Sequence, residues 1–151
     1  MNTLNNKESA MHPFINHIQL GYFGLLPFLA CVFWPLLLGT SVIAIDTFIY
    51  YSLGILAFMA GTLWRAGEQS YTHAVMAVLV VIPFPLLALF NAPTVLGYLA
   101  VSYPTLLVFE RGMPTWQNYH KDYHKMRYVL TSVVFVCHLF MLAQSVELTR
   151  L

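Results

Sequence analysis

The sequence predicts an all-α membrane protein: a multi-pass transmembrane bundle of about five helices, with a short interfacial helix in the fourth loop. Of its 151 residues, 59% are hydrophobic and 9% are charged, whereas an ordinary soluble domain is about 25% charged. A chain this short could not cover so much apolar side chain with polar surface in water. Long stretches also lack Asp, Glu, Lys and Arg altogether: 9–45, 47–64, 69–109 and 128–146. Lipid is therefore the expected solvent.

Five apolar stretches are each close to the roughly 20 residues with which an α-helix crosses a bilayer. The transmembrane domain is expected over 17–146, between a polar tail (1–16) and a C-terminal tail (147–151), with spans at 17–38, 47–64, 71–90, 94–109 and 128–146. Asn91-Ala92-Pro93 is expected to form the turn before the fourth span. That span is the weakest because it is short and holds Pro104, and a re-entrant or tilted segment is the alternative.

Prolines are expected to bend these helices, and small residues are expected to set how closely they pack. Neighbouring helices can re-satisfy the backbone groups that proline frees, so kinks rather than breaks are expected at Pro27, Pro35, Pro83, Pro85 and Pro104. Small residues allow close approach of helix backbones in lipid. We expect such packing on the face of the second span formed by Gly54, Ala57 and Gly61, with chance spacing as the alternative; Gly21 and Gly24 form a weaker version in the first span.

Basic residues in the loops predict the orientation. With five spans, the N-terminal tail, second loop and fourth loop share one side of the membrane. That side holds six basic residues: Lys7, Arg65, Arg111, Lys121, Lys125 and Arg127. The other side holds only Arg150. The asymmetry places the N-terminus in the cytoplasm and the C-terminus outside.

The fourth loop is the main polar segment. Trp116, Tyr119 and Tyr123 would share one stripe of a helix over 116–125, which is typical of a helix lying in the lipid headgroup layer. A second interpretation is that His120 and His124, at i and i+4, share a metal ion.

A third interpretation of the same loop is a site for an anionic headgroup, held by Lys121, Lys125, Arg127 and the two histidines. The interfacial helix is favoured, and no bound metal is expected. Two histidines alone leave a zinc ion two ligands short of its usual four.

Other polar residues lie at or within the expected spans. Arg65 and Glu68 are one helical turn apart. They form either a surface pair in which the arginine snorkels toward water or a polar site that faces the bundle. His138 lies near mid-membrane, where an ionisable residue is by default a functional hypothesis; a neutral histidine bonded to a neighbouring helix is the favoured alternative. Asp46 is expected to cap the second span.

Several classes of function find no support in the sequence. The net charge of +1 gives no reason to expect a nucleic-acid partner. Cys31 and Cys137 lie in apolar runs and are expected to be buried hydrophobes. We find no pattern for a catalytic triad, a phosphate loop or a haem held by two histidines at one depth. No cofactor is therefore expected.

Landmarks along most of the chain resemble a known family. They include the run 20–28 (LGYFGLLPF), the stretch 51–64, Pro114, Trp116, 126–127 and 130–131. The chain resembles the transmembrane protein 69-like family, number 3429 among domains of unknown function. This family is bacterial and mitochondrial, and the resemblance implies an α-helical inner-membrane protein of about five spans and implies no activity. A bacterial inner membrane is the expected location. The family's second span typically ends in a His-Trp-Gly type sequence, where this chain has Leu63, Trp64 and Arg65.

The scarcity of embedded polar residues favours a non-enzymatic protein that partners or helps to assemble a membrane complex. A small oligomeric transporter or channel is the first alternative, supported if polar groups converge on Arg65, Glu68 and His138. A membrane enzyme that acts on lipid-like substrates through His120 and His124 is the second. The expected partners are the lipid bilayer and either another membrane protein or a second copy of the chain.

Overall fold

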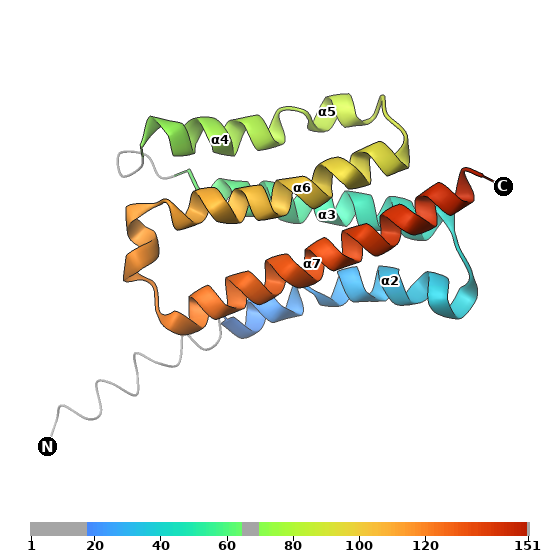
Figure 1. The fold of residues 1–151 in the computed structure, drawn as a ribbon, viewed down its shortest axis with the longest axis horizontal. Coiled ribbons are helices and arrows are strands. Elements are labelled where there is room, and N and C mark those ends of the chain that lie inside the picture. Colours follow the sequence, from blue (N-terminus) through green and yellow to red (C-terminus); the bar gives the residue numbers. More distant parts are fainter. Residues whose placement is uncertain (1–17, 65–69, 151) are drawn as a thin grey trace, which may run out of the picture.

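The computed structural model describes residues 18–64 and 70–150, and regular structure within these ranges is helical throughout (Figure 1). A helical segment at 18–23 precedes α2 (Leu26–Leu38), α3 (Val42–Thr62), α4 (Tyr71–Val81), α5 (Phe84–Leu87), α6 (Ala92–Arg111), the 3-10 helix η1 (Pro114–Asn118) and α7 (Lys121–Leu148). The predicted all-α bundle is confirmed. Four helices of the described chain are long and apolar enough to cross a membrane: Ile18–Leu38, α3, α6 and α7.

The chain runs back and forth along the bundle (Figure 1). The turns at 39–41 and 88–91 lie at the same end as residue 150, whereas residue 18, the end of α3 and η1 lie at the opposite end. α4 and α5 follow one another along α6, so the pair runs the length of the bundle although neither helix does so alone. This is the up-and-down arrangement of helix bundles with short connections.

Prolines divide two of the expected spans more sharply than the sequence suggested. In the first span the helix at 18–23 passes through a turn at Gly24 and Leu25 before α2 begins, because Pro27 lacks the N–H for an i→i−4 bond. In the third expected span, Pro83 and Pro85 remove two such donors within one turn, and the helix breaks between α4 and α5. The kink expected at Pro83 and Pro85 is therefore a break.

The fourth expected span is a continuous helix of 20 residues, so its ranking as the weakest was wrong. The predicted turn before this helix is present, and Asn91 caps the helix. Its side chain accepts hydrogen bonds from the Thr94 backbone N–H at 3.2 Å and from the Thr94 hydroxyl at 2.6 Å. The helix continues through Pro104. The expected cap by Asp46 was also wrong, since α3 begins at Val42 and Asp46 lies exposed in its second turn.

The continuous interfacial helix expected at 116–125 is not present. Its residues fall instead into η1 and the first turns of α7, separated by extended backbone at Tyr119 and His120. His120 ends the break by capping α7, since its Nδ1 accepts a 3.4 Å bond from the Asp122 backbone N–H. α7 thus begins seven residues before the expected fifth span.

The core lies where α3 packs against α2 and α6, and α6 packs along α7. Its largest fully buried side chains are Phe28, Phe48, Leu56, Leu63, Leu96, Leu99, Met141, His138 and Ser52. Cys31 and Cys137 are buried as predicted. The Phe28 and Phe48 rings meet edge to face with their centroids 5.3 Å apart, a favourable aromatic geometry. The side chains of Ser52 and His138 are thus fully buried among mainly apolar neighbours.

The glycine faces behave differently from the prediction. Gly54 and Gly61 are exposed, and a Cβ built on either would meet nothing within 4 Å. The weaker signal in the first span marks the tight contact instead, because a Cβ on Gly21 would lie 2.6 Å from Met126 Sδ of α7. Which glycine makes a close contact is decided by the face that each helix turns toward the core.

Candidate functional site

Two polar clusters lie on one face of α7. Arg127 and His138 are eleven residues apart, which at 100° per residue is three turns plus about 20°. Thr131 and Val134 continue the same face between them. At 1.5 Å per residue the two clusters are separated by about 16 Å along the helix axis. The structure therefore keeps these two predicted residues in separate sites.

The first cluster surrounds His138, which is fully buried. Its Nε2 lies 2.8 Å from the Ser52 hydroxyl oxygen, and its Nδ1 lies 2.7 Å from the Val134 carbonyl oxygen. A carbonyl can only accept, so Nδ1 carries the proton; in a neutral ring Nε2 then accepts from the Ser52 hydroxyl. The Tyr103 hydroxyl in turn donates to the Ser52 carbonyl at 2.8 Å. A neutral histidine satisfies all of these bonds, as in the favoured sequence interpretation.

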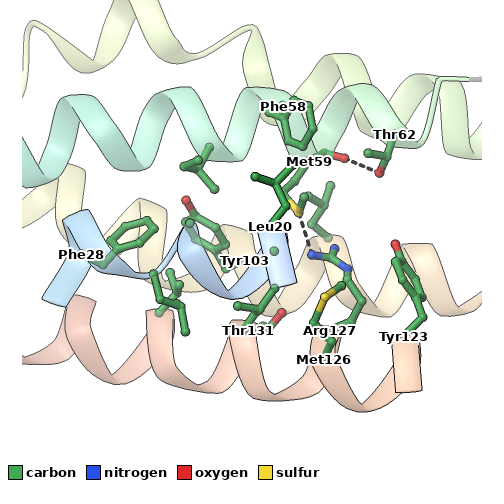
Figure 2. Close-up of a pocket in the computed structure, with 17 residues that line it drawn as sticks. Leu20, Phe28, Phe58, Met59, Thr62, Tyr103, Tyr123, Met126, Arg127 and Thr131 are labelled. Carbon is green, nitrogen blue, oxygen red and sulfur yellow. Dashed lines mark hydrogen bonds between the residues drawn. The ribbon is translucent and has the colours of Figure 1, made fainter. Parts of the chain in front are cut away.

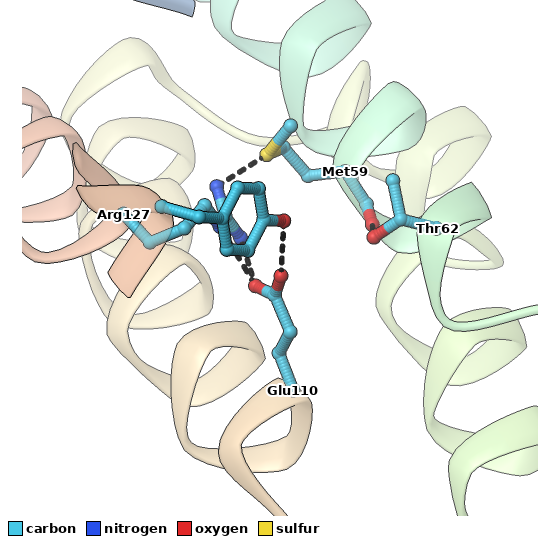
Figure 3. A network of polar contacts seen from close by, with 5 residues as sticks. Met59, Thr62, Glu110 and Arg127 are labelled. Atoms are coloured by element: carbon cyan, nitrogen blue, oxygen red, sulfur yellow. Dashed lines mark hydrogen bonds and ion pairs between the residues drawn. The ribbon is translucent and has the colours of Figure 1, made fainter. Parts of the chain in front are cut away.

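The second cluster is a buried ion pair between Arg127 of α7 and Glu110 of α6 (Figure 3). Both side chains are about 5% exposed. The guanidinium Nε and Nη2 both donate to Glu110 Oε2, and the Tyr123 hydroxyl donates to Oε1 at 2.8 Å. Each carboxylate oxygen is thus engaged, which is the condition under which a buried charge pair is tolerated.

The third nitrogen of the Arg127 guanidinium has a weaker partner. Its Nη1 points to the thioether sulfur of Met59 on α3, 2.6 Å away (Figure 3). Arg127 therefore links three helices: its own, α6 through Glu110, and α3 through Met59. Beside this contact lies a cavity of about 350 Å³ whose walls come from the first span, α3, α6 and α7 (Figure 2).

The two histidines of the fourth loop point to different partners. His120 is exposed, and its Nδ1 lies 3.1 Å from Asp122 Oδ2. His124 stacks on the buried Trp116 ring with centroids 4.3 Å apart, and its Nε2 donates to the Trp116 carbonyl at 2.8 Å. This stacking fastens η1 to the first turn of α7. Among the described residues, no group of three or more His, Cys, Asp or Glu could hold a metal ion.

Arg65 and Glu68, the remaining predicted polar pair, lie outside the described residues. Sequence reasoning missed Glu110, Ser52 and Tyr103. The sequence did carry a signal for Glu110. Glu110 follows the fourth apolar stretch and Arg127 precedes the fifth, so both residues are expected at the same membrane boundary. Ser52 and Tyr103 carried no such signal, since serine and tyrosine are common in apolar helices.

Residues 15–143 match a family described as a protein of unknown function, DUF3429. The chain belongs to this family. The matched range includes both polar clusters and the cavity between them. No curated protein and no solved structure matches the chain. In this DUF3429 protein, Leu63 is fully buried in the core. It occupies the position at which the family resemblance led us to expect histidine.

Proposed function

We propose that this DUF3429 protein is a multi-pass inner-membrane protein that acts as a non-enzymatic partner or assembly component of a membrane complex. The proposal is supported by how the buried polar side chains are used. Arg127 binds Glu110, and His138 binds Ser52, so these groups join helices to one another. A chain with this internal bonding is suited to present a fixed surface to a partner.

The observation that carries the proposal is the outward face of α3. Exposed aromatic side chains alternate there with exposed glycines at about four-residue spacing: Tyr50, Gly54, Phe58 and Gly61. A surface with large and small side chains in alternation suits close helix packing. A second helix can place its backbone over the glycines and its side chains between the aromatics. A transmembrane helix of another membrane protein is the proposed occupant.

We further propose a bacterial inner membrane with the N-terminus cytoplasmic and the C-terminus external. Support comes from the distribution of charge along the bundle. The end of α6 and the first turns of α7 lie at the same end of the bundle as η1, and they carry Arg111, Lys121, Lys125 and Arg127 (Figure 1). Arg150 follows the opposite end of α7. Cytoplasmic loops carry the excess of Lys and Arg in membrane proteins.

The partner role is tested by purification of the protein from its native host in mild detergent, with mass spectrometry of what co-elutes. The wild type is expected to retain a membrane protein in fixed ratio. Gly61→Leu should lose it, because the bulky side chain keeps the helices apart.

Gly97→Leu is the matched control, since Gly97 is also a helical glycine with open space around it but lies on α6. Retention of the same companion by both variants, or its loss from both, would count against the α3 face. A wild-type protein that elutes alone would count against the partner role itself.

A further inference from the structure

The cavity beside Arg127 is a feature of the described residues that the two polar clusters leave unexplained. Its volume of about 350 Å³ lies within the roughly 300–1,000 Å³ typical of small-molecule sites. Apolar side chains form most of its wall, among them Leu25, Phe28, Ile55, Leu106, Leu130 and Val134 (Figure 2). Tyr123, Arg127 and Thr62 lie toward one end of the lining, while Tyr103 and Thr131 lie nearer its middle (Figure 2). The site is thus mostly apolar, with its charged group, Arg127, toward one end.

The cavity opens toward the outside of the bundle between the first span and α3. Leu20 and Phe58 line it from these two elements, and each is 68% exposed. Gly24 and Leu25, which form the turn in the first span, also line the cavity. In a bilayer such an opening faces the acyl chains, so an apolar molecule can enter without passing through water.

The hydrogen-bonding capacity of Arg127 is not fully used. Glu110 takes Nε and Nη2, while Nη1, with two N–H groups, has the Met59 sulfur as its partner. A thioether is a weak acceptor compared with an oxygen. A charged donor that is 4% exposed gains free energy from any better acceptor that reaches it. The cavity wall is where such an acceptor would arrive.

We propose that this cavity binds an apolar molecule that presents a carbonyl oxygen to Nη1 of Arg127. An anion is disfavoured, because Glu110 already balances the guanidinium and a second negative charge would be buried without a counter-charge. A neutral carbonyl on an apolar body matches both the donor and the wall. Two membrane constituents have this chemistry, namely quinones and acyl esters. Phe58 lines both this cavity and the proposed partner face, but ligand binding is measured on the purified chain and so does not rest on the partner role.

The test measures the melting temperature of the purified protein in detergent with three added compounds. Decyl-benzoquinone and dioctanoylglycerol carry carbonyls, whereas decylbenzene does not. At one hundred times its Kd, a true ligand should raise Tm by roughly 5–10 °C. Whichever carbonyl compound raises Tm identifies the source. No shift with either one, or an equal shift with decylbenzene, would overturn the proposal.

Variants locate the binding. Ile55→Phe fills the cavity and should abolish the shift, while Ile43→Phe, the same change on the exposed part of α3, should preserve it. Leu130→Phe fills the cavity from α7 and serves if Ile55→Phe does not fold. Met59→Leu removes the sulfur and should tighten carbonyl binding about tenfold, because Nη1 is then unpartnered before binding. Equal shifts in the filled and control variants would place the ligand elsewhere.

Discussion

A guanidinium in the interior of a helix bundle is stable only while an anion stays beside it. Arg127 and Glu110 meet this condition between α7 and α6, and the Tyr123 hydroxyl completes the shell of the carboxylate. The net contribution of such a pair is small, because desolvation of two charges offsets most of their attraction. Loss of one partner is costly, since the other charge is left buried.

We expect Glu110→Gln to lower the free energy of unfolding by about 3 kcal/mol, because Arg127 then lacks a counter-charge. Glu147→Gln, an exposed change on α7, should leave it within about 0.5 kcal/mol of wild type. The double variant Glu110→Leu, Arg127→Met should recover most of the loss. Reversible unfolding in detergent measures all three. A double variant as unstable as the single one would show that the pair contributes more than its neutral replacement.

The Ser52 hydroxyl is expected to matter more than its size suggests. Ser52→Ala leaves His138 Nε2 without a donor in a fully buried position and should cost about 1–2 kcal/mol. Ser102→Ala is the matched control, because Ser102 is also buried but its hydroxyl donates to the Tyr98 carbonyl of its own helix. Unfolding measurements on both variants test this difference. Equal losses would mean that the bond to His138 adds nothing specific.

At the scale of elements, close approach of the first span to α7 depends on Gly21. The Met126 side chain lies over this glycine, and its flexible end can adjust to a methyl group but not to a branched side chain. The outward glycines of α3 meet no such neighbour within the chain. Two glycine pairs of similar appearance therefore have different structural roles.

Gly21→Leu should lower the thermal stability of the purified protein strongly, by about 2 kcal/mol or more, because overpacking forces the first span away from α7. Gly61→Leu should leave the stability of the isolated chain nearly unchanged, since space around it is open. Thermal melts in detergent compare the two. A large loss in Gly61→Leu alone would contradict the open space around this glycine.

At the scale of the whole molecule, the orientation of the chain in the membrane depends on whether the α4–α5 segment crosses it. Tyr71–Leu87 is shorter than the candidate spans and is broken by proline, yet the segment runs beside α6 over the length of the bundle (Figure 1). If it crosses the membrane, the two ends of the chain lie on opposite sides. If it does not, every later connection changes side.

Reporter fusions therefore test the orientation directly. Fusions at the N-terminus and at Gly112 should report the cytoplasm, and fusions at Phe90 and after Arg150 should report the outside. The basis is the excess of basic residues near η1 and the start of α7. Two termini on the same side would show that α4 and α5 do not cross together.

The sequence alone determined that the chain is helical, that it is built for lipid and roughly where its long helices lie. Uncharged runs of about 20 residues have few other stable forms in a bilayer, since every backbone group must be bonded within the segment. The landmarks of the chain also predicted the DUF3429 family, which the match over 15–143 confirms. The Asn91 turn was readable because its capping chemistry is local.

Only the tertiary structure decided which faces of these helices meet. The side chains of a lipid-exposed face and of a packed face are equally apolar, so periodicity does not distinguish Gly21 from Gly61. The pairing of Arg127 with Glu110, and of His138 with Ser52, depends on helices that are neighbours in space but 17 and 86 residues apart in sequence. In lipid, helix contacts follow from close packing and hydrogen bonds, and these are set by the rotation and tilt of whole helices.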